Sequence, residues 1–101
     1  MSDFVKIAAV ADIPAGAGRT VEVNGRQIAV FNSDGEFYAI DNICKHKGGP
    51  LGEGELDGKT VLCPLHGWAY DIRSGECLED SECSVDKFEV KVEGGEVWEK
   101  A

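Results

Sequence analysis

The chain has 101 residues, of which 43% are hydrophobic, and its formal net charge at pH 7 is -9. This length is typical of one domain, and the apolar fraction is that of a globular protein, which excludes general disorder. The negative charge argues against a nucleic-acid partner, because phosphates would be repelled, and it favours encounter with a basic protein surface.

No stretch approaches the roughly 18 consecutive apolar residues of a membrane span. The N-terminus, MSDFVKIAAVADIP, lacks a basic leader followed by a long apolar segment, so no secretory signal is visible. We therefore expect a soluble, cytoplasmic protein. A disulfide framework is not the default for the four cysteines of such a protein.

Short strands separated by two-residue turns dominate the sequence. Alternating apolar runs on either side of Asn24-Gly25 are the strongest short signal for a β-hairpin, and Asp34-Gly35 and Gly94-Gly95 repeat the device. Apolar residues never recur at helical spacing over three turns, so no helix is expected. Strands are expected within 4–8, 20–31, 36–40, 58–63, 68–72 and 87–100. The predicted class is all-β, a small sandwich or partly open barrel.

The segment 42–75 interrupts this rhythm, because it is rich in Gly and Pro and contains little that resembles a strand. A span of this kind inside a compact domain is usually a functional site. We expect 1–101 to be a single domain with a small subdomain inserted at approximately 42–75, formed by two loops that a short hairpin brings together. The acidic run that follows, at 75–86, is expected to be a solvated surface loop.

Both histidines of the chain alternate with cysteines inside this segment. Cys44 and His46 form a C-x-H pair, and Cys63 and His66 form a C-x-x-H pair. A nucleophilic cysteine with a histidine base is disfavoured, because no Asn or Asp is evidently placed to orient either imidazole. Zinc sites usually group like ligands, with C-x₂₋₄-C preceding H-x₃₋₅-H. Here each loop contributes one of each, so two cysteines can face one iron and two histidines the other, as in a Rieske 2Fe-2S centre. Zinc stays the alternative.

The sequence resembles a Rieske-type ferredoxin over nearly its whole length. CKHKGG is similar to the first cluster loop of that family, CPLHGWAYD to the second and FEVKVEGGEVW to the closing hairpin. The resemblance implies the Rieske fold, an antiparallel β-sandwich base domain with an inserted cluster-binding subdomain. It also implies that Cys44 and Cys63 bind the buried iron of a 2Fe-2S cluster, while His46 and His66 bind the iron nearer solvent.

Mixed ligation should raise the reduction potential, because two thiolates and two imidazoles leave the oxidised site neutral whereas four thiolates make it dianionic. High-potential relatives have a loop disulfide and a serine where this chain has Gly49, Leu65 and Trp68. Tyr70 remains at the position whose hydroxyl can bond a ligand sulfur. Fewer donors predict the low end of the Rieske range, nearer about -150 than +300 mV. Gly67 is expected to let a backbone N–H approach the cluster closely.

The expected function is one-electron transfer from an NAD(P)H-dependent flavoprotein reductase to a terminal oxygenase or similar enzyme. Lys45 and Lys47 flank the histidine edge and are expected to influence partner choice. The alternative with the same cofactor is the small Rieske-type subunit of an assimilatory nitrite reductase, and the alternative of another class is a zinc-stabilised interaction module. The chain is too short to include a mononuclear iron domain, so no catalytic residue is assigned. Cys77 and Cys83 are expected to be thiols outside the site, with a local disulfide as the alternative.

Overall fold

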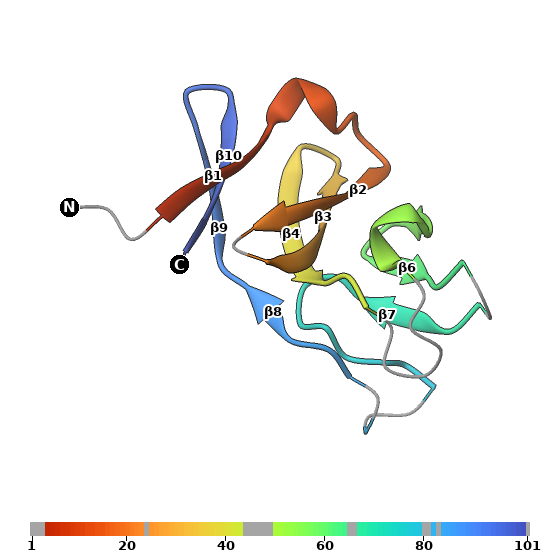
Figure 1. The fold of residues 1–101 in the computed structure, drawn as a ribbon. Coiled ribbons are helices and arrows are strands. Elements are labelled where there is room, and N and C mark those ends of the chain that lie inside the picture. Colours follow the sequence, from red (N-terminus) through yellow and green to blue (C-terminus); the bar gives the residue numbers. More distant parts are fainter. Residues whose placement is uncertain are drawn as a thin grey trace.

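A computed structural model of the chain describes residues 4–23, 25–43, 50–64, 67–79, 82 and 84–100 (Figure 1). Within these residues the chain forms ten strands and two short 3-10 turns. The strands are β1 (Phe4–Ala9), β2 (Ala17–Val23), β3 (Arg26–Ser33), β4 (Glu36–Asp41), β5 (Glu55–Asp57), β6 (Thr60–Leu62), β7 (Ala69–Asp71), β8 (Lys87–Phe88), β9 (Val90–Glu93) and β10 (Glu96–Lys100). The turns are η1 (Val10–Asp12) and η2 (Leu51–Glu53). No helix of the described chain has the length and apolarity needed to cross a membrane.

The strands of the described chain pair into three antiparallel sheets, which confirms the predicted all-β class. Their orders are β1-β10-β9, β2-β3-β4-β8 and β5-β6-β7. The third sheet lies between β4 and β8 in sequence, inside the segment expected to carry the inserted subdomain. Strand β5 was not anticipated, because its three residues, Glu-Leu-Asp, have no apolar run of their own.

The three predicted hairpin turns are confirmed. Val23 pairs with Arg26, Ser33 with Glu36 and Glu93 with Glu96, so each turn contains two residues. Positive φ angles occur in all three turns. They are 80° at Gly25, 53° at Asp34, 92° at Gly35, 62° at Gly94 and 78° at Gly95. Such turns match the right-handed twist of the strands they join, which is why the Asp-Gly and Gly-Gly pairs are informative.

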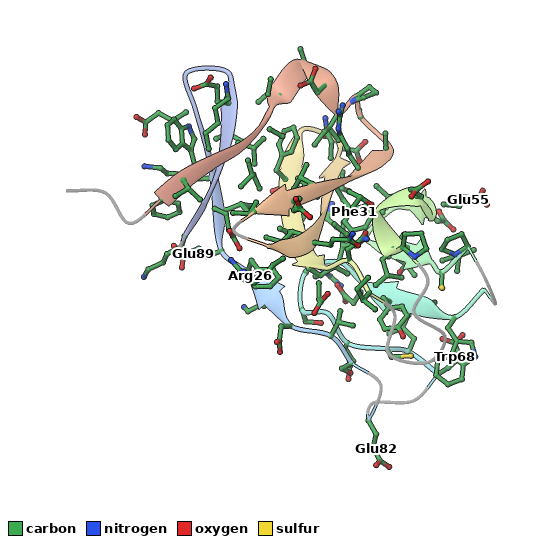
Figure 2. All side chains as sticks on the ribbon, in the orientation of Figure 1. Arg26, Phe31, Glu55, Trp68, Glu82 and Glu89 are labelled. Atoms are coloured by element: carbon green, nitrogen blue, oxygen red, sulfur yellow. The ribbon has the colours of Figure 1, made fainter. Side chains whose placement is uncertain are left out.

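The central sheet has a separate apolar core on each of its faces. Along β3, Ile28 and Val30 face one core, whereas Ala29 and Phe31 face the other, and all four are fully buried. The first core lies against the β1-β10-β9 sheet and completes the predicted sandwich, while the second joins the central sheet to η2 and the β5-β6-β7 sheet. Figure 2 shows Phe31 between the central strands and the inserted segment. A strand buried on both faces reads as a continuous apolar run rather than an alternating one.

The molecule is elongated, with principal extents of 38 × 25 × 18 Å. Phe4 and Lys100 pair in the β1-β10-β9 sheet, and the strands β6 and β7 lie at the opposite end of the molecule (Figure 1). The β5-β6-β7 sheet is therefore distant from β1 and β10.

Strand β7 ends in an ion pair between Asp71 and Arg73. The guanidinium donates from Nε to Oδ1 at 3.1 Å and from a terminal nitrogen to Oδ2 at 2.9 Å, and the backbone N–H of Arg73 donates to Oδ1 at 2.8 Å. The hydrogen bonds from the guanidinium hold the pKa of the Asp71 carboxyl below its ordinary value. This ion pair lies at the start of the connection from β7 to β8.

Removing this guanidinium should make the free energy of unfolding depend less on pH in the acid range. Because the pKa of Asp71 is lowered in the folded chain, its pair stabilises the fold above the unfolded pKa, about 3.9. That contribution is lost as pH falls through the folded-state pKa. We expect Arg73→Ala to lower the urea midpoint near neutral pH, with the difference from wild type closing in acid. Arg19→Ala removes the same charge from an exposed position on β2 and serves as control. A difference for Arg73→Ala that persists unchanged below the folded pKa would contradict this account.

Candidate metal centre

Of the four predicted ligands, Cys63 is within the described residues. The other three, together with several residues to which the sequence assigned roles, lie outside them. Those residues are Cys44, Lys45, His46, Lys47, Gly49, Leu65, His66 and Cys83. The structure therefore gives the positions of the segments on either side of each predicted loop, and the geometry of the site is built from those segments.

Cys63 directly follows β6 and belongs to the second apolar core, with a relative exposure of 2%. Its backbone N–H donates to the Trp68 carbonyl at 2.8 Å, and its carbonyl accepts the Gly67 N–H at 2.8 Å. These two bonds close the base of the C-x-x-H turn. Gly67 has φ 75°, and a Cβ on it would meet nothing within 4 Å. Glycine is thus favoured at position 67 by the left-handed backbone conformation. The Gly67 N–H is bonded to the Cys63 carbonyl within the turn, and not directed at a cluster as expected.

The segment that carries Cys44 and His46 is closed at its base in a similar way. Ile43 and Pro50, which flank it, form an isolated antiparallel bridge. The N–H of Leu51 donates to the Asn42 carbonyl at 2.7 Å, one residue farther out on each side. Leu51 then begins η2 and is fully buried in the same core as Cys63. Leu51 therefore ties the exit of the first loop to this core.

Two close backbone approaches connect the bases of the two loops. A Cβ on Gly52 would lie 2.6 Å from the Thr20 hydroxyl and 2.7 Å from the Thr20 nitrogen, so η2 lies directly on β2. A Cβ on Gly54 would overlap the carbonyl oxygen of Leu62, the residue before Cys63. The exit of the first loop is thereby held against the strand that enters the second. These contacts hold together the described segments that flank the two predicted loops.

The aromatic residues of the second loop divide between core and surface. Tyr70 is fully buried in the core that contains Cys63, and no described buried side-chain nitrogen or oxygen lacks a hydrogen-bond partner. Its hydroxyl therefore has a hydrogen-bond partner. Trp68 packs against the same core and is partly exposed, and it lies at the end of the molecule formed by β7 (Figure 2). Where high-potential relatives place a hydroxyl donor, this chain places an indole.

The acidic run after β7 is more than a solvated loop, which corrects the sequence-based expectation. Cys77 is a buried thiol that forms an isolated bridge with Tyr70, so the alternative of a disulfide at Cys77 is not supported. The N–H of Leu78 donates to the Ala69 carbonyl at 2.8 Å, and the N–H of Ala69 donates to a Glu79 carboxylate oxygen at 2.8 Å. One acidic side chain thus holds the run against the second loop, a role that no sequence signal indicated.

The donor chemistry fits a [2Fe-2S] group. Cys63 presents a thiol to the end of an apolar core at the base of a closed turn, so a thiolate there would be shielded from water. The first Cys-His pair begins two residues after Asn42, and Gly54, on the exit side of that loop, lies against the Leu62 carbonyl next to Cys63. Around Cys63 the structure shows backbone hydrogen bonds with Gly67 and Trp68 and the apolar packing of the second core. Soft thiolate and imidazole donors on two such loops suit iron–sulfur ligation.

Comparisons with known proteins agree with this chemistry. The ferredoxin component of the naphthalene 1,2-dioxygenase/salicylate 5-hydroxylase systems of a Ralstonia species is 38% identical over 76 residues, 75% of this chain and 73% of that one. A solved complex of oxygenase and ferredoxin in carbazole 1,9a-dioxygenase contains a chain with a TM-score of 0.85 at 34% identity, over 99% of this chain and 94% of that one. A solved nitrite reductase (NADPH) small subunit has a TM-score of 0.85 at 27% identity, over 97% and 98%.

The match to a family model is more extensive than the ligand motif. The model of the Rieske [2Fe-2S] domain matches residues 3–89, which include the central sheet, both predicted cluster loops and the acidic run. The predicted family and its cofactor are thereby confirmed. This chain belongs to the Rieske [2Fe-2S] domain family.

Proposed function

We propose that this chain is a one-electron carrier that takes electrons from an NAD(P)H-dependent flavoprotein reductase and passes them to a terminal oxygenase. The observation that carries the proposal is the pair of Cys-His loops whose bases are joined at one end of a Rieske domain. Ferredoxin components of dioxygenase systems are the relatives that support this role. The chain is an electron-transfer protein and not an enzyme by itself, and we place it in the cytoplasm.

The proposed iron ligands are Cys44 and Cys63 on one iron and His46 and His66 on the other. The cluster, when bound, takes up and releases one electron. The chain contributes the buried thiol of Cys63 and a core that excludes water from it. Imidazole ligands near the surface would bring the exchanged electron close to a partner.

We place the midpoint potential at the low end of the Rieske range. The potential of such a centre depends on hydrogen bonds to its sulfurs and on solvent exposure. Trp68 occupies the position of a hydroxyl donor in high-potential relatives, and its indole is partly exposed. The buried Tyr70 keeps the expected value from being the lowest of all. A measured midpoint above about +100 mV would be inconsistent with this assignment.

The partner surface we propose includes apolar side chains beside the two loops. Among the described residues, the exposed large hydrophobics are Ile43, Leu78 and Val92, with exposures of 43, 55 and 49%. Ile43 adjoins Cys44 in sequence, and Leu78 is bonded to Ala69 beside the second loop. Val92 lies on β9, in the sheet beside the chain ends. Single exposed apolar side chains are ordinary on protein surfaces, so the proposal rests on the positions of Ile43 and Leu78 beside the two loops.

The small subunit of a nitrite reductase is the second candidate, and the likeness to a solved protein of that description favours it. In that role the chain would be fixed to a large subunit rather than exchange between partners. A purified monomer that a separate flavoprotein reductase reduces at catalytic rates supports the mobile carrier. Stable co-purification with a large nitrite-reducing subunit supports the alternative.

The ligand assignment can be tested with two buried cysteines of the same core. Cys63 and Cys77 are both thiols with relative exposures of 2%. We expect Cys63→Ser to abolish the brown colour and the dithionite-bleachable visible absorption, because a ligand is lost. Cys77→Ser should retain the wild-type iron content and spectrum. Loss of the chromophore in Cys77→Ser alone would exclude the assignment, and a colourless wild-type protein purified with zinc would exclude the cluster.

The partner surface can be tested with two exposed apolar residues. We expect Leu78→Gln to slow electron delivery to the oxygenase by about fivefold or more, which corresponds to the loss of about 1 kcal/mol of docking energy. Val92→Gln, at the other end of the molecule, should transfer electrons at the wild-type rate. Both variants should keep the wild-type spectrum, and stopped-flow reduction of the oxygenase gives the rates. Equal slowing by the two variants would show that the surface around Leu78 has no special role.

A further inference from the structure

Asn42 uses all of its hydrogen-bonding groups within the described residues, and its exposure is 0%. Its backbone N–H donates to the Gln27 carbonyl at 3.2 Å, and its carbonyl accepts the Leu51 N–H at 2.7 Å. Its side-chain Oδ1 accepts the Gly52 N–H at 2.7 Å and the Thr20 hydroxyl at 2.9 Å. Its Nδ2 donates to the Gln27 side chain at 3.3 Å. We call these bonds the Asn42 network.

The Asn42 network joins three parts of the chain that are distant in sequence. Thr20 is on β2 and Gln27 is on β3, and both belong to the central sheet. Leu51 and Gly52 are the first residues of η2, after the first predicted cluster loop. Asn42 itself is the second residue before Cys44. One neutral side chain therefore bonds the entrance and the exit of that loop to each other and to the central sheet.

Because Cys44 follows Asn42 by two residues, the bonds that fix Asn42 also restrict where Cys44 can lie. Consecutive Cα atoms are about 3.8 Å apart, so the Cα atoms of Asn42 and Cys44 cannot be more than about 7.6 Å apart. The exit of the loop is constrained as well, because Gly52 lies against Thr20 and Gly54 against the Leu62 carbonyl next to Cys63. A displacement of Asn42 would thus change the separation of the two ligand pairs.

We propose that Asn42 is a positioning residue for the cluster, which sets the separation of the two ligand loops before iron binds. The proposal rests on the ligand assignment given above. Asn42 is neutral, and its side chain acts through hydrogen bonds to the Gly52 N–H, Thr20 and Gln27, so its effect on the loop is geometric. Residues that orient metal ligands from outside the ligand shell typically change metal affinity about 10- to 100-fold when they are removed.

The chain offers a matched control in Asn32. Asn32 is also buried, with a relative exposure of 6%, and its side chain likewise spans distant segments. Its Nδ2 donates to the Ile13 carbonyl at 2.7 Å, and its Oδ1 accepts the Gly35 N–H at 2.8 Å. It lies toward the other end of the β3–β4 hairpin from Asn42, since Asn32 pairs with Phe37 whereas Ile28 pairs with Asp41. Truncating either Asn should lower stability, but only Asn42 is bonded to a ligand loop.

The experiment compares Asn42→Ala and Asn32→Ala as purified cluster-loaded proteins. Urea midpoints are measured first, and bleaching of the visible absorption by an iron chelator is then followed without urea, at a temperature where circular dichroism shows both variants folded. We expect Asn42→Ala to bleach about tenfold faster than wild type or more. Asn32→Ala should bleach within about twofold of wild type. Redox titration should show a shifted midpoint potential for Asn42→Ala and an unchanged one for Asn32→Ala.

A milder variant keeps the test decisive if Asn42→Ala does not fold. Thr20→Val removes one bond to Asn42 Oδ1 and leaves the Gly52 bond in place, so it should accelerate bleaching in the same direction by a smaller factor. Equal bleaching rates for the Asn42 and Asn32 variants, or a wild-type rate in Thr20→Val, would overturn the proposal. A wild-type protein without the chromophore would overturn the ligand assignment itself, an outcome that the wild-type spectrum separates from the others.

Discussion

Strand β3 has to pack two apolar cores at once, and the rest of the molecule depends on this constraint. Its side chains alternate between the faces of the central sheet, so Val30 packs in the sandwich and Phe31 packs toward the inserted segment. Its backbone is paired with β2 on one side and β4 on the other. A strand held on both edges and both faces cannot shift its register without exposing one core. The inserted segment is therefore built on the most constrained part of the fold.

Close backbone approaches connect β3 to the segments that flank the predicted cluster loops. Gly18 has no Cβ, which would lie 2.5 Å from the Phe31 ring, so the ring can pass over β2 toward Leu51. Gly52 then lies on Thr20, and the Asn42 side chain bonds both. Each step uses packing or a buried hydrogen bond rather than an exposed ion pair. Such contacts are stiff because interiors are close-packed and unsatisfied buried polar groups are costly.

A carrier of electrons needs a rigid ligand frame and an accessible edge, and the two requirements are met by different residues. Cys63 is buried in the second core, whereas Ile43 and Leu78 remain exposed beside the loops. Glu79 holds the acidic run against Ala69, so part of the chain's negative charge has a defined place near the second loop. The net charge of -9 then favours encounter with basic partners at low salt. The buried core thus holds the ligand frame, and the exposed side chains are available to a partner protein.

Local sequence patterns determined the three hairpins, the all-β class and the two Cys-His pairs, because turn chemistry and ligand spacing act over a few residues. They could not identify Asn42, since an asparagine before a cysteine is ordinary in a loop and its partners are as distant as Thr20. The role of Glu79 was likewise hidden, because it depends on a contact between its side chain and Ala69, ten residues away. The amino-acid sequence by itself thus determined the fold class and the family, and it is the basis of the proposed ligand set. Only the tertiary structure decided how the ligand loops are held, because that depends on contacts between segments distant along the chain.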